Sequence, residues 1–161
     1  GKCNRTTFKN VFGEEESGDF ALEKYLKNSN LEEISGIIFQ IGINDVQKIY
    51  NAKNNELKNG ILKLIQLSKK YLNNPKILLI LPLEIEPQIL KTHFSELFDE
   101  TSIEKSKILA SLYLKIAQEE NIKALDLSEI VEVSKIDGLH FNETNHKKIF
   151  SAVKNTLSSL I

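Results

Sequence analysis

Asp137 and His140 stand three residues apart in the stretch KIDGLHFNETNH (135–146), with a glycine between them. A histidine is a useful general base near neutral pH only when its tautomer and ring orientation are fixed. A carboxylate that accepts a hydrogen bond from Nδ1–H fixes both and stabilises the imidazolium that forms. Gly138 allows a tight backbone between the two side chains. The pattern predicts a histidine base with an orienting carboxylate; the alternative is a turn aspartate beside an exposed loop histidine.

A second polar motif, GIND (42–45), follows an apolar run. Asn44 could point its side-chain amide into a cleft, where an N–H group stabilises an oxyanion. Asp45 is expected to cap the following helix or to brace the loop. The alternative is a plain strand–turn–helix junction, because glycine, asparagine and aspartate are all favoured in turns.

Three short apolar runs, at 35–42, 75–83 and 122–128, are predicted to be buried strands. Apolar residues at helical spacing predict helices within 44–72, interrupted at NAKNN (51–55), and over 101–122 and 142–161. For the helix over 101–122, we expect Thr101 or Ser102 as the N-cap, with Glu104 completing a capping box. For the last helix, the expected N-cap is Asn142 or Thr144.

Alternating strands and helices predict a single α/β domain over residues 1–161, with a parallel sheet flanked by helices. In such domains, ligands bind beyond the carboxyl ends of the strands. GIND follows the first strand and DGLH follows the third, so both motifs can converge at this edge, together with CNRTT (3–7). The segment 84–100 after the second strand could form a lid or one wall of an acyl pocket, or a packed surface helix.

The composition excludes several other classes of protein. With 21 Lys and Arg against 22 Asp and Glu, the net charge of −1 gives no case for nucleic acid or an anionic membrane as partner. No apolar run approaches the roughly 20 residues of a membrane span. Cys3 is the one cysteine, which excludes an internal disulfide and favours a reducing compartment such as the cytoplasm. No Cys/His cluster has zinc spacing, and the sequence is compatible with a homo-oligomer.

GIND and DGLH resemble two signature blocks of the SGNH (GDSL) hydrolase superfamily. The opening GKCNRTTF (1–8) is similar to the GLNGRTT segment of its arylesterase and acyl-thioesterase branch. The stretch 106–130, leading into DGLHFNETNHKKI, resembles that branch's penultimate helix, last strand and final helix. The resemblance covers nearly the whole chain. It implies a three-layer, flavodoxin-like fold and a serine ester hydrolase that acts on small acyl esters or thioesters without a metal or organic cofactor.

Carried over residue by residue, the resemblance assigns His140 as the general base and Asp137 as its orienting carboxylate. Asn44 would donate to the oxyanion, and Gly42 would allow the close turn before it. The second donor would be the backbone N–H of Asn4, where the family usually has glycine. Asparagine at this position adds a side chain and restricts the backbone that carries the donor.

The family's nucleophile is a serine in an N-terminal GDS block, and these 161 residues contain no such block. We expect the family's first strand, first helix and second strand to precede Gly1. Three explanations stay open: an upstream segment carries the serine, the domain has lost it and binds or regulates, or Cys3 replaces it.

Three further residues could contact a ligand. His93 is expected on the surface or in a lid. His146 is expected to face outward or to pack near the start of the last helix. Arg5 could bind an anionic group or hold its own loop, and the sequence does not choose between these two roles.

Overall fold

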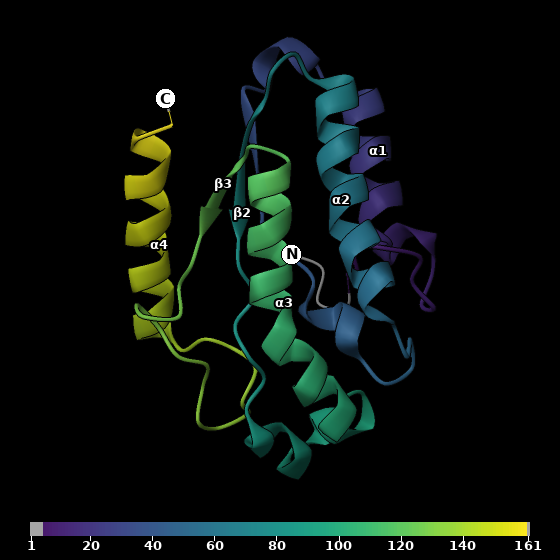
Figure 1. Ribbon diagram of the computed structural model, residues 1–161, viewed down its shortest axis with the longest axis vertical. Coiled ribbons are helices and arrows are strands. Elements are labelled where there is room, and N and C mark those ends of the chain that lie inside the picture. Colours follow the sequence, from purple (N-terminus) through teal and green to yellow (C-terminus); the bar gives the residue numbers. More distant parts are fainter. Residues whose placement is uncertain (1–4, 161) are drawn as a thin grey trace.

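The computed structural model describes residues 5–160 and contains a parallel three-stranded sheet (Figure 1). The strands are β1 (Gly36–Phe39), β2 (Lys76–Ile80) and β3 (Lys123–Leu125), in the order β1–β2–β3. The three predicted strands are confirmed. Each is shorter than predicted. Within residues 5–160, no strand pairs with the outer edge of β1.

Helices cover both faces of the sheet, as the three-layer prediction requires. Figure 1 shows α2 (Asn54–Tyr71) and α3 (Glu100–Glu119) on one side of the strands and α4 (Glu143–Ser158) on the other. The larger hydrophobic core lies beneath α2 and α3, and a smaller one, which includes Ile80 and Ile149, lies beneath α4. In the described part of the chain, no helix is long and apolar enough to cross a membrane.

The helix α2 follows the predicted interruption of the 44–72 segment. Asn51 takes a left-handed conformation with φ 43°, which ends the preceding turn. The Glu56 carboxylate then accepts a hydrogen bond from the Lys53 backbone N–H at 2.8 Å. The apolar face of α2 is almost completely buried, and its most deeply buried side chains are Leu57, Ile61, Leu64 and Ile65.

The predicted N-cap of the helix over 101–122 was wrong. Asp99 is the N-cap of α3: its carboxylate accepts the Ser102 N–H at 2.9 Å, and the Ser102 hydroxyl accepts the Asp99 N–H at 3.2 Å. Ser102 therefore belongs to the capping box as its third helical residue, because the helix already begins at Glu100. For α4, the predicted cap Asn142 is confirmed, since its side chain accepts the Asn145 N–H at 2.8 Å.

One helix, α1 (Gly18–Asn28), was not predicted. It packs beside α2 (Figure 1), and the Tyr71 hydroxyl donates to Glu23 at 2.8 Å. A Cβ on Gly18 would lie 2.5 Å from the Thr6 carbonyl oxygen, so this helix start needs glycine. The backbone bridge between Thr6 and Ser17 thereby ties the start of the chain to α1.

Candidate functional site

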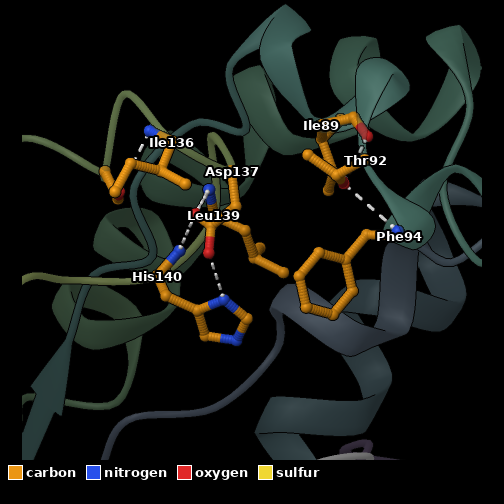
Figure 2. A network of polar contacts seen from close by, with 8 residues as sticks. Ile89, Thr92, Phe94, Ile136, Asp137, Leu139 and His140 are labelled. Carbon is orange, nitrogen blue, oxygen red and sulfur yellow. Dashed lines mark hydrogen bonds and ion pairs between the residues drawn. The ribbon is translucent and has the colours of Figure 1, made fainter.

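The loop between β3 and α4 brings Asp137 and His140 into contact (Figure 2). Asp137 Oδ2 lies 2.9 Å from His140 Nδ1, and Asp137 Oδ1 accepts the backbone N–H groups of Leu139 and His140, each at 3.0 Å. One carboxylate thus fixes both the turn and the imidazole. The side chain of His140 is 58% exposed, so the ring is accessible from solvent.

Gly138 makes this turn possible. Its φ is 69°, and a Cβ would lie 2.6 Å from the Glu86 carbonyl oxygen. Ser134 closes the loop from both sides: its carbonyl accepts the Gly138 N–H at 2.7 Å, and its N–H donates to the His140 carbonyl at 2.7 Å. The spacing of three residues therefore produces a defined backbone shape.

The charge of Asp137 follows from its donors. Burial raises the pKa of the Asp137 carboxyl, but hydrogen bonds from the Leu139 and His140 N–H groups and from the imidazole outweigh it, and the pKa is lowered below 3.8. An ionised carboxylate at this place favours the imidazole tautomer with its proton on Nδ1. In the neutral ring, Nε2 is then the basic nitrogen.

The GIND turn forms a 3₁₀ turn, η3 (Ile43–Val46), directly after Gly42. Gly42 has φ 119°, and a Cβ there would lie 2.1 Å from the Tyr113 hydroxyl oxygen, so the turn requires glycine. The Asn44 amide nitrogen donates to the Arg5 carbonyl at 3.1 Å, and its oxygen accepts from Gln47 Nε2 at 3.1 Å. The oxyanion role of Asn44 stays a prediction.

Asp45 braces the loop and caps no helix. The side chain is fully buried, and its carboxylate accepts the Thr7 N–H at 2.8 Å and the Thr7 hydroxyl at 2.5 Å. Burial raises the pKa of the Asp45 carboxyl to about 7, even though both hydrogen bonds from Thr7 lower it. Asn44 and Asp45 together hold residues 5–7 against the end of β1.

Of the other predicted residues, the structure describes Arg5, His93 and His146. Arg5 Nη1 donates to the Ser17 carbonyl at 3.4 Å, which holds its own loop. His93 is exposed, and the ring of His146 packs edge-on against Phe141 at 5.9 Å. The predicted second oxyanion donor Asn4 and the alternative nucleophile Cys3 lie outside the described residues.

An apolar cavity of about 90 Å³ lies at the carboxyl ends of the strands. Ile43 and Leu139, the immediate neighbours of Asn44 and His140, both line it. The two motif turns therefore border the same cavity, at the edge where ligands bind in parallel α/β sheets.

One residue of this region was not predicted from the sequence. The Phe94 ring lies 5.1 Å from the His140 ring, with the two planes tilted by 52°. Phe94 stands in an irregular segment without the periodicity of a strand or a helix, so no local signal placed it against the histidine.

Comparison with known proteins places the fold of this chain in a wider group. No protein-family model and no curated protein matches the sequence. Solved structures do match. A carbohydrate acetylesterase from Sinorhizobium meliloti superimposes with a TM-score of 0.89 at 21% identity, over 100% of this chain and 77% of its own. The aryl esterase of M. smegmatis gives 0.87 at 21% identity, again over 100% and 77%.

A third match extends the group to lipases. A GDSL-like lipase from Bacteroides thetaiotaomicron gives a TM-score of 0.66 at 16% identity, over 90% of this chain and 74% of its own. The chain has the SGNH (GDSL) hydrolase fold. Asp137 and His140 lie in the loop between β3 and α4, the last helix of this fold.

Proposed function

We propose that this chain provides the histidine–aspartate pair of a serine ester hydrolase that acts on small acyl esters or thioesters. The observation that carries the proposal is the 2.9 Å contact between Asp137 Oδ2 and His140 Nδ1. It lies at the carboxyl edge of a parallel sheet whose fold is shared with solved esterases. The nucleophilic serine is proposed to come from a segment outside these 161 residues.

In the proposed mechanism, His140 Nε2 takes the proton of the serine hydroxyl as its oxygen attacks the ester carbonyl carbon. Asp137 stabilises the imidazolium that forms. The tetrahedral intermediate expels the alcohol or thiol, which takes the proton from Nε2. Water, deprotonated by the same nitrogen, then attacks the acyl-enzyme. The bond between the acyl carbon and the serine oxygen breaks, the serine takes the proton back from Nε2, and the acid is released.

Charge on the tetrahedral oxygen needs hydrogen-bond donors. We assign this role to two donors, the Asn44 side-chain amide and the backbone N–H of Asn4. Gly42 allows the close turn that precedes Asn44. The apolar cavity between the two motif turns supports a small acyl group, because about 90 Å³ is well below the roughly 300 Å³ at which pockets for larger ligands begin.

The test is the hydrolysis of short-chain acyl esters by the purified protein, including the segment proposed to carry the serine, and by two histidine variants of it. We expect His140→Ala to lower kcat at least about a hundredfold, since general acid–base catalysis contributes about 10²–10⁴. His146→Ala is the matched control, because that histidine also packs against a phenylalanine but belongs to α4. Equal activity of all three proteins would contradict the role of His140 as the general base. No activity in the wild type would favour a non-catalytic binding domain on the same fold.

A further inference from the structure

The segment 84–98 connects β2 to α3 and contains the 3₁₀ turns η4 (Pro87–Lys91) and η5 (His93–Glu96). It packs into the main core. Its most deeply buried apolar side chains, each at most 2% exposed, are Ile85, Ile89 and Phe98. The predicted surface helix does not form, since the segment packs on the domain as two 3₁₀ turns, and Glu84 at its start lines the apolar cavity. The segment therefore offers fixed side chains to its neighbours.

Hydrogen bonds join the segment to both motif turns. The Glu86 N–H donates to the Gly138 carbonyl at 2.9 Å, next to Asp137. On the other side, the Lys48 N–H donates to the Leu97 carbonyl at 2.9 Å, just beyond the GIND turn. The segment thus spans from one motif to the other.

Phe94 is the residue of this segment that contacts the histidine. The Thr92 hydroxyl oxygen accepts the Phe94 N–H at 3.2 Å and donates to the Ile89 carbonyl at 2.8 Å, so the start of η5 is fixed to a buried residue. Figure 2 shows the Phe94 ring beside the His140 imidazole, whose Nδ1 is joined by a dashed line to the Asp137 carboxylate. The ring separation of 5.1 Å lies within the range of favourable aromatic pairs.

The imidazole needs such a contact. Its side chain is 58% exposed, and the hydrogen bond to Asp137 holds it at one atom, Nδ1. A ring held at one atom can rotate away from the carboxylate, and a half-buried aromatic ring packed on the core blocks part of that rotation.

We propose that Phe94 is a positioning residue that holds the His140 imidazole against Asp137. The catalytic consequence rests on the function proposed above, whereas the orientation of the ring does not. An aromatic pair of this kind changes the oriented population by about 2- to 10-fold. We therefore expect Phe94→Leu to lower kcat by about 2- to 10-fold and to leave KM for a small ester unchanged.

Two measurements on the purified protein test this proposal. The first is the NMR signal of the His140 Nδ1 proton, which the hydrogen bond to Asp137 should shift to low field and protect from exchange. We expect this signal to broaden or vanish in Phe94→Leu. The second is the kcat and KM of ester hydrolysis. Phe98→Leu is the matched control: it shortens a buried phenylalanine of the same segment, and we expect lower stability with the His140 signal unchanged.

The outcomes separate the two proposals. A protected His140 signal in Phe94→Leu that equals the wild-type signal would overturn the positioning role, whatever the activity. Loss of the signal in both Phe94→Leu and Phe98→Leu would also overturn it, because the effect would then come from general loosening of the segment. A wild-type protein that hydrolyses no ester would contradict the proposed function, and the NMR comparison would still decide the role of Phe94.

Discussion

Asp45 and Asp137 lie in the two motif turns, yet their surroundings give them opposite properties. Asp45 is completely buried against Thr7, and burial raises its pKa to about 7. Asp137 is 20% exposed and accepts two backbone N–H groups as well as the imidazole. Although burial raises its pKa, these donors lower it below 3.8 overall. The number of hydrogen-bond donors around each carboxyl group and its access to solvent decide which of the two aspartates can be the charged partner of the imidazole.

The largest contrast is expected in catalysis. Asp137→Asn should lower kcat about 10²–10⁴-fold, because an asparagine amide can donate to Nδ1 and so favour the wrong imidazole tautomer. Asp45→Asn keeps groups that can bond to the Thr7 N–H and hydroxyl, and we expect a loss of less than tenfold. Steady-state ester hydrolysis by the two variants checks this. Similar losses at both positions would contradict the division of roles.

The next contrast concerns stability against pH. The folded-state pKa of Asp45 lies above its ordinary 3.8, so the folded protein holds this proton more tightly than the unfolded chain. Its contribution to the free energy of unfolding therefore falls as pH rises from about 4 to about 7. The difference between 3.8 and about 7 sets a ceiling of about 4 kcal/mol.

Urea unfolding at a series of pH values measures this dependence, with Asp45→Asn as the control. The variant has no carboxyl at this position, so its stability relative to the wild type should increase between pH 4 and pH 7. Parallel stability curves for the two proteins would show that Asp45 ionises as freely in the folded state as in the unfolded chain.

The sequence predicted the regular part of this architecture well. Apolar periodicity identified the strands and α2, α3 and α4, and the DxxH spacing identified the Asp137–His140 contact. The helix α1 was missed because its apolar residues do not form one buried face: Leu26 is fully buried, whereas Phe20 and Tyr25 are exposed. The hydrogen bond from Asn44 to Arg5 and the contact of Phe94 with His140 join residues 39 and 46 positions apart. Such contacts depend on tertiary packing, which local patterns do not encode.

The next prediction concerns Gly42, the glycine of the GIND turn. Gly42→Ala should lower the free energy of unfolding by about 2–4 kcal/mol, because it combines a positive φ with a clash at the Tyr113 hydroxyl. Adding Tyr113→Phe removes the nearest atom and should restore part of the loss, since that hydroxyl has no partner among the described residues. Thermal or urea unfolding of the single and double variants checks this. If the double variant is no more stable than Gly42→Ala, the whole loss of stability comes from the strained backbone and none from the clash with the hydroxyl.

The smallest expected effect is the acid response of Asp137. Its pKa is lowered in the folded state, so its stabilising contribution is present above about pH 4 and is lost as pH falls through the lower, folded-state value. This sign is opposite to that of Asp45. Below pH 4, wild type should therefore lose stability faster than Asp137→Asn, and equal acid sensitivity in urea unfolding would show that the hydrogen bonds to Asp137 add no net stability.

The most direct test of the central claim is the intact mass of the purified protein before and after treatment with a fluorophosphonate, which labels activated serines. We predict one adduct in wild type and in His146→Ala, mapped by peptide digestion to a serine outside these 161 residues, and little labelling in His140→Ala. No adduct in wild type would contradict a serine hydrolase. An adduct that forms equally fast in His140→Ala would contradict the role of His140 as the base.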